Sequence, residues 1–155
     1  MHMTRDIWET KVRSIKTDED IKRAFNVVKQ LRTHQTEDTY LNTVKEMMEK
    51  QNYHMFGLYD PLNDWKLLSV IGFAPTLTLY YGNIVWVHDL VTDYDERGNR
   101  YGEHLLAFVE EEWAEKYGYD TVALTSGFEK IRAHHFYTNH MNYDKVSYLF
   151  KKNLK

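Results

Sequence analysis

Apolar residues recur at helical spacing in two stretches near the start of the chain. Thr17 can cap the first stretch, with Asp20 three positions later, and its apolar face consists of Ile21, Ala24, Phe25, Val28 and Leu31. Thr36 can open the second stretch, whose apolar face consists of Tyr40, Leu41, Val44, Met47 and Met48. A short strand is expected before them, from Lys11 to Ile15. The pattern therefore predicts one strand followed by two amphipathic helices.

The middle of the chain has the composition of strands. Three ranges, Tyr53–Tyr59, Trp65–Phe73 and Leu77–Val91, are rich in aromatic and β-branched residues. Turn-forming residues separate them, at positions 60–64 and at Gly82-Asn83. We expect an antiparallel meander of three strands here.

A long helix is predicted after the meander. Gly118 stands where a C-terminal cap is expected, and the apolar face is traced by Tyr101, Leu105, Phe108, Val109 and Trp113. A strand from Thr121 to Thr125 follows. Because a helix that links two strands is typical of a parallel crossover, we expect this strand to lie parallel to the third meander strand. A last helix, about 129–139, and a last strand, about Tyr143 to Lys152, complete the prediction.

Length and composition indicate one folded domain of mixed α/β class over residues 1–155. The length matches the common domain size, and the chain is 43% hydrophobic and 28% charged with two prolines, which is typical of a globular protein. No internal repeat, low-complexity tract or linker interrupts it.

Charge and cysteine content exclude several classes of function. A net charge of -3 with a pI near 6.2 argues against a dedicated nucleic-acid binder, which needs a concentrated basic surface. Zero cysteines exclude disulfides, zinc thiolate sites and thiol nucleophiles. No apolar run approaches the roughly 20 residues of a membrane span, and the start MHMTRDIWET lacks the apolar core of a signal peptide. We therefore expect a cytoplasmic protein that binds no membrane.

The segment from Trp86 to Leu106 is a strand, a polar turn and an amphipathic helix, an arrangement suited to hold an anion. The first amides of a helix have no intrahelical acceptors and its dipole is positive at that end, so a diphosphate can lie on the backbone from Arg97 to Gly102. Gly98 permits close approach, and Arg97 and Arg100 add cationic donors. The alternative is an ordinary helix start with two surface arginines.

This turn resembles motif A of the GNAT acetyltransferases, written Arg/Gln-x-x-Gly-x-Gly/Ala after a strand. Arg97 and Gly102 match the first and last places, and Arg100 stands where the middle glycine is expected. Ala133-His-His-Phe-Tyr137 resembles the family's Ala-x-x-Phe-Tyr on a later helix. Lys130 occupies the place of an asparagine that contacts the cofactor in many members.

The resemblance covers about residues 10–152 and implies a fold and a cofactor. The fold would be a central mixed, mostly antiparallel twisted sheet, splayed at the fourth strand, with about four helices. The co-substrate would be acetyl-CoA, without a metal. Its expected contacts are Leu90, Val91, Thr92, Arg97, Gly98, Asn99, Arg100, Tyr101, Gly102, Glu103 and Lys130.

The resemblance also implies direct transfer of acetyl to a primary amine, with a small molecule favoured over a protein acceptor. The amide of Leu90 would polarise the thioester carbonyl. Tyr137 would act as general acid toward the departing sulfur. His88 and Asp89 are the candidate bases, and because strand side chains alternate, only one of them should face the cleft. For each of these two, a structural hydrogen bond is the alternative.

Other polar clusters have plainer interpretations. The histidines at 134, 135 and 140 lack metal-binding helical spacing, and the acidic residues at 93, 95 and 96 indicate a solvated turn. Glu37, Asp38 and Tyr40 can attract a cationic acceptor or simply begin a helix. The rival function is a non-catalytic acyl-CoA sensor or interaction module with the same fold. A homodimer is plausible from base rates alone.

Overall fold

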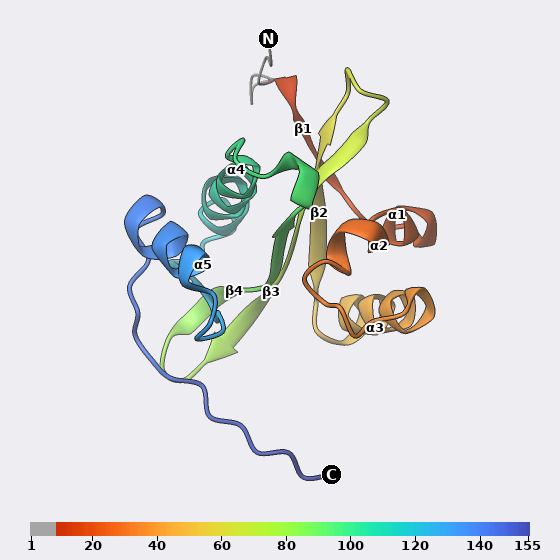
Figure 1. The fold of residues 1–155 in the computed structure, drawn as a ribbon. Coiled ribbons are helices and arrows are strands. Elements are labelled where there is room, and N and C mark those ends of the chain that lie inside the picture. Colours follow the sequence, from red (N-terminus) through yellow and green to blue (C-terminus); the bar gives the residue numbers. More distant parts are fainter. Residues whose placement is uncertain (1–8) are drawn as a thin grey trace. The chain divides into compact units, whose positions relative to one another are not determined.

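The computed structural model describes residues 9–155 and contains a five-stranded sheet (Figure 1). The strands follow one another across the sheet in chain order: β1 (Lys11–Ser14), β2 (His54–Asp60), β3 (Lys66–Thr78), β4 (Gly82–Thr92) and β5 (Thr121–Leu124). Neighbours from β1 to β4 are antiparallel, and the sheet as a whole is mixed, which confirms the predicted fold class. The signal-peptide expectation rests mainly on residues 1–8, which lie outside the described residues.

The first two predicted helices begin at their predicted caps. The Thr17 hydroxyl accepts from the Asp20 amide at 3.1 Å, and Thr36 forms a capping box with Thr39. The first predicted helix is divided at Ala24 into two short ones. The helices are α1 (Asp18–Arg23), α2 (Phe25–Val28), α3 (Glu37–Lys50), the 3₁₀ turn η2 (Tyr94–Glu96), α4 (Tyr101–Phe108), the π-helical η3 (Val109–Ala114), α5 (Ile131–His135) and the π-helical η4 (Phe136–His140).

Helices pack on both faces of the sheet in the part of the chain up to Ala123 (Figure 1). Helices α1 to α3 cover one face, where Ile21, Val44 and Val70 belong to one buried cluster, and α4 covers the other. Residues 124–155 form a second compact unit, so the single domain over 1–155 stays a prediction. Among residues 9–155, none of the helices has the length and apolar character needed to cross a bilayer.

The hairpin between β3 and β4 differs from the prediction. β3 continues to Thr78, five residues beyond the expected end, and the turn lies at 79–81 rather than at Gly82-Asn83. The Thr78 hydroxyl accepts from the Tyr81 amide at 2.8 Å and closes this turn. Gly82 has φ +73 and is the first residue of β4. Gly82 therefore follows the turn, whereas the sequence pattern predicted that Gly82 and Asn83 would form it.

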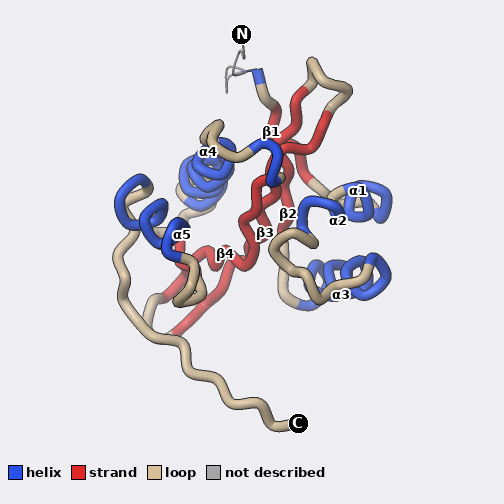
Figure 2. The backbone as a smooth tube through the Cα atoms, in the orientation of Figure 1, coloured by secondary structure: helices blue, strands red, loops and turns tan. Residues whose placement is uncertain are grey.

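The strand predicted from Tyr143 to Lys152 is absent. This segment carries no strand or helix (Figure 2), and its apolar side chains are exposed, among them Phe150 at 90% and Tyr148 at 75%. Strand-forming residue types make a strand only when a neighbouring strand supplies hydrogen bonds. The prediction was wrong because composition carries no information about that partner.

Candidate functional site

A β-bulge in β4 shapes the candidate site. Gly72 of β3 lies opposite Asp89 and Phe73 lies opposite Val87, which leaves His88 as an extra residue in β4. The bulge interrupts the strand alternation on which the prediction of opposite faces for His88 and Asp89 rests. Both side chains lie beside Tyr53: its ring centroid is 5.9 Å from that of His88, and its hydroxyl bonds to Asp89.

The Asp89 carboxylate is bound at both oxygens. Arg32 Nε donates to Oδ1 at 2.8 Å, and the Tyr53 hydroxyl donates to Oδ2 at 2.6 Å. A second nitrogen of Arg32 donates to the carbonyl oxygen of His88 at 2.7 Å. The Arg32 guanidinium therefore binds the bulge at the backbone of His88 and at the side chain of Asp89. This geometry favours a structural role for Asp89. Sequence reasoning missed Arg32 because a single arginine after α2 carries no signal of a partner 57 residues away.

Tyr53 is the buried donor of this cluster. Burial, and then the neighbouring Asp89 carboxylate, raise the pKa of the Tyr53 hydroxyl well above its usual value, so it remains a proton donor at any physiological pH. The hydroxyl reaches Asp89 by passing directly over Gly72, where an added Cβ would overlap it. Glycine at this position is thus required by the path of the tyrosine side chain.

We expect Gly72→Ala to lower the free energy of unfolding by about 1–3 kcal/mol, because the new methyl group must displace the Tyr53 ring and hydroxyl. Urea denaturation measures this loss. The matched control is Gly102→Ala, whose Cβ would meet Thr92 Oγ1 at an ordinary 3.5 Å. Equal stability of the two variants would contradict the close approach at Gly72.

His88 is the more available of the two candidate bases. Its side chain is half-buried, and burial lowers the pKa of the imidazole, with the Arg32 guanidinium acting in the same direction and Asp89 opposing it. A lowered pKa keeps the ring neutral near pH 7, and a neutral imidazole can accept a proton. Of the two candidate bases, the Asp89 carboxylate is held by two hydrogen bonds, and the His88 ring is the one that can accept a proton.

The backbone of β4 after the bulge presents alternate groups to its outer side. The Asp93 amide donates to the Leu68 carbonyl at 2.9 Å, so Asp93 and Val91 direct their backbone groups toward β3. By alternation, the backbone groups of Leu90 and Thr92 point away from β3. The strand on that side, β5, has only 4 residues against the 11 of β4, so it pairs with at most part of this edge. Val91 instead contributes a core side chain, 5% exposed.

The turn before α4 has a glycine-like backbone at two positions. Gly98 has φ +88, with no atom within 4 Å of the place where a Cβ would be. Arg100 is the N-cap of α4 at φ 66 and ψ 23, a left-handed conformation that favours glycine, and its side chain makes no capping hydrogen bond. Its guanidinium pairs with Glu103, at 2.6 Å and 3.0 Å, and its side chain is 77% exposed. Arginine therefore occupies a glycine position without blocking the helix start with its own side chain.

The left-handed conformation of Arg100 predicts a stability difference between two variants that both remove its ion pair. We expect Arg100→Gly to be about 1 kcal/mol more stable than Arg100→Ala, because only glycine adopts positive φ without steric cost. Denaturant titration of the pair measures the difference. Equal midpoints would show that residue 100 leaves the left-handed region in solution.

Two polar side chains of this turn donate to nearby backbone carbonyls. Arg97 Nε donates to the Thr92 carbonyl at 3.3 Å, and within residues 9–155 this is the one hydrogen bond of its guanidinium. The Asn99 amide group donates to the Glu96 carbonyl at 3.0 Å and fixes the turn. The Tyr101 side chain is buried at 4% exposure, so its possible contribution to a ligand is through the backbone. Together with the first amides of α4, these residues fit an anionic group such as a diphosphate.

Tyr137 and Lys130 belong to the second unit. Tyr137 lies in η4, its carbonyl accepts from the Tyr143 amide at 2.8 Å, and burial raises the pKa of its hydroxyl. A raised pKa keeps the hydroxyl protonated, as a proton donor must be. Lys130 is the exposed N-cap of α5. In this unit the His134 ring contacts the Gly127 carbonyl at 2.8 Å.

The remaining polar candidates have structural roles. The Tyr40 hydroxyl donates to the Ile21 carbonyl at 2.7 Å in the core, so it is not available to bind the amine substrate. Glu37 and Asp38 form the first turn of α3. Asp93 caps η2 by accepting from the Asp95 amide. Across residues 9–155 there is no group of three or more His, Cys, Asp or Glu side chains arranged to hold a metal ion.

Comparison with known proteins gives consistent similarities. The model of the acetyltransferase (GNAT) family matches residues 18–143. The uncharacterized N-acetyltransferase YhdJ of Bacillus subtilis (strain 168) is 31% identical over 141 residues, which cover 91% of this chain and 96% of the relative. The fold resembles a transcriptional regulator from Bacillus halodurans C-125, with TM-score 0.79 and 17% identity over 94% and 99% of the two chains. It also resembles aminoglycoside N-acetyltransferase AAC(6')-Iy in complex with CoA, with TM-score 0.78 and 13% identity over 94% and 95%.

Proposed function

The chain belongs to the GNAT acetyltransferase family, and from this premise we propose that it transfers the acetyl group of acetyl-CoA to the primary amine of a small molecule by direct attack in a ternary complex. The observation that carries the proposal is the turn 97–102, where a glycine-like backbone opens α4 directly after the bulged strand β4. The turn suits the anionic diphosphate of the coenzyme, and the edge of β4 suits its extended pantetheine arm.

The residues of this chain fit the coenzyme in two places. The diphosphate would lie on the amides of Gly98 to Glu103, with the Arg97 guanidinium adding a charged donor. The pantetheine arm would pair with the outward carbonyl of Leu90 and the outward amide of Thr92, as an added strand does, because the Thr92 carbonyl already accepts from Arg97. The aminoglycoside acetyltransferase of similar fold is in complex with CoA, which supports the proposal that this chain also binds the coenzyme.

The chemistry follows from where protons can be taken and given. Acetyl-CoA supplies an activated thioester. His88, neutral near pH 7, takes a proton from the ammonium group of the acceptor, directly or through water. The Leu90 amide donates to the thioester carbonyl as the amine nitrogen forms its bond to the carbonyl carbon and the carbon–sulfur bond breaks. Tyr137 donates its proton to the departing sulfur, which leaves as a thiol. The nitrogen loses its second proton as the amide forms, and this proton returns through water to the Tyr137 oxygen, while His88 releases its own proton to solvent.

Thiol release from acetyl-CoA over a panel of primary amines tests this function. We expect at least one small amine to release thiol in stoichiometry with its N-acetyl product, identified by mass spectrometry. Binding of acetyl-CoA with no thiol release from any amine would favour a non-catalytic sensor. The absence of any thermal shift with acetyl-CoA at about 100 times a typical dissociation constant, where about 2.7 kcal/mol of stabilisation is expected, would contradict cofactor binding altogether. The cytoplasmic location and the homodimer stay predictions.

A further inference from the structure

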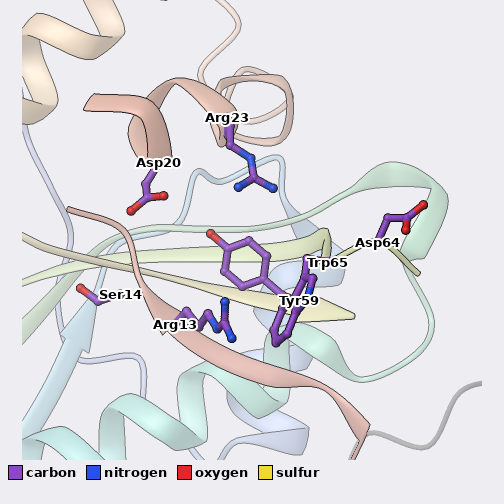
Figure 3. Close-up of a pocket in the computed structure, with 7 residues that line it drawn as sticks. All are labelled: Arg13, Ser14, Asp20, Arg23, Tyr59, Asp64 and Trp65. Carbon is purple, nitrogen blue, oxygen red and sulfur yellow. The ribbon is translucent and has the colours of Figure 1, made fainter. Parts of the chain in front are cut away.

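A cavity separate from the candidate site lies at the β1 edge of the sheet. It is bounded by β1, α1 and the turn that joins β2 to β3 (Figure 3). It has a volume of about 380 Å³, within the usual range for small-molecule sites. Its walls are Arg13, Ser14, Asp20, Arg23, Tyr59, Asp64 and Trp65. None of these residues belongs to β4, to the turn 97–102 or to the Asp89 cluster.

The Tyr59 hydroxyl is the central polar group of this cavity. Tyr59 is 9% exposed as a whole residue, and no hydrogen bond of its hydroxyl is found within residues 9–155. Because no buried side-chain oxygen of these residues lacks a partner, the hydroxyl oxygen is reached by solvent from the cavity. Figure 3 shows the hydroxyl directed into the space between α1 and Arg13. The ring lies across Gly57, where a Cβ would come within 2.9 Å of it, so the bare glycine makes room for this orientation. A hydroxyl directed into an open cavity can bind water there, and a ligand that enters can take the place of that water.

Four charged side chains line this cavity and are not paired with one another. Asp20 and Arg23 come from α1, Arg13 from β1 and Asp64 from the turn after β2. No ion pair involves any of the four among the described residues. The cavity therefore offers two positive and two negative groups to a ligand.

The wall of the cavity is held by an unusual backbone. Asp64 and Trp65 follow one another at φ 51 and φ 56, in the left-handed region that non-glycine residues seldom adopt. The Arg13 guanidinium lies 3.6 Å from the centroid of the Trp65 ring. Strained backbone tends to be retained where a site needs a particular side-chain position. Here the backbone conformation of Asp64 and Trp65 places the Trp65 ring beside the Arg13 guanidinium.

We propose that this cavity binds a small zwitterion, a molecule with a carboxylate and an ammonium group a few atoms apart, such as a free α-amino acid. The Tyr59 hydroxyl and the Arg23 guanidinium bind the carboxylate, because both are donors. Asp20, which lies on the same side of the cavity as the Tyr59 hydroxyl, binds the ammonium group, and Trp65 covers the side chain. This site is separate from the acetyl-transfer site and does not depend on the function proposed for it.

Isothermal titration without acetyl-CoA tests the proposal, with each free α-amino acid as probe. The matched analogues are the amino-acid amides, which lack the carboxylate, and the N-acetyl amino acids, which lack the ammonium group. We expect at least one free amino acid to bind, with both analogues at least about tenfold weaker, because each has lost one charged contact. Inorganic phosphate serves as the anion control and is expected to bind weakly.

Variants locate the binding. Tyr59→Phe and Arg23→Gln should each raise the dissociation constant of the amino acid by at least about tenfold. His88→Ala and Lys45→Gln should leave this constant unchanged. Arg23 lies at the end of a surface helix, so its variant keeps the test valid if Tyr59→Phe fails to fold. The proposal is overturned if no amino acid binds at concentrations up to about 10 mM. It is equally overturned if phosphate binds as tightly as the amino acid, or if His88→Ala alone abolishes binding.

Discussion

Tyr137→Phe should lower kcat by about 10²–10⁴-fold, the usual contribution of a positioned general acid. The substitution removes one oxygen atom and leaves the ring, so the contacts with the Phe136 and Tyr143 rings are kept. The KM for acetyl-CoA should change by less than about threefold, because the hydroxyl acts on the departing sulfur rather than on the bound coenzyme. Steady-state thiol release, measured with the best amine of the panel, gives both constants.

The control for this prediction is Tyr148→Phe, which removes a hydroxyl from a side chain that is 75% exposed in the same unit. It should have the activity of the unchanged protein. Because burial raises the pKa of Tyr137, loss of its proton should not reduce kcat at any pH below about 10. Full activity of Tyr137→Phe would remove the general acid from the mechanism.

Arg97→Gln should raise the dissociation constant of acetyl-CoA by about 10–100-fold, because a hydrogen bond from a charged group to phosphate contributes about 1.5–3 kcal/mol. Titration calorimetry measures the constant, and kcat at saturating acetyl-CoA should be nearly unchanged. The affinity of the unchanged protein should also fall with added salt more steeply than that of the variant.

The matched control is Arg100→Gln, an arginine of the same turn with the same loss of charge. Its guanidinium is already paired with Glu103, so we expect less than about a threefold change in affinity. If Arg100→Gln weakens acetyl-CoA as much as Arg97→Gln does, the division of roles between the two arginines is incorrect.

Local sequence signals predicted the elements well. Thr17 and Thr36 were identified as helix caps because a cap is defined by residues three positions apart. The order of the elements followed from helical periodicity and from strand-forming composition, because both are properties of a short stretch of chain. The turn 97–102 was found because glycine and arginine next to a helix start form a local pattern.

Features that depend on distant residues were not predictable in the same way. The bulge at His88 depends on the pairing of β4 with β3, and the grip of Arg32 on Asp89 joins residues 57 positions apart. Gly72 has its role only because Tyr53 crosses it. The false strand after Tyr143 is the converse case, in which suitable residue types lack a partner strand. The cavity around Tyr59 likewise combines β1, α1, β2 and a turn, and no single stretch of sequence indicates it.

A crystal structure of the protein with coenzyme A bound tests the central claim most directly. The account predicts the diphosphate within hydrogen-bond distance of the amides from Gly98 to Glu103, with the pantetheine arm along Leu90 and Thr92. A diphosphate bound elsewhere, or an Arg100 side chain turned into the start of α4 in its place, would contradict it.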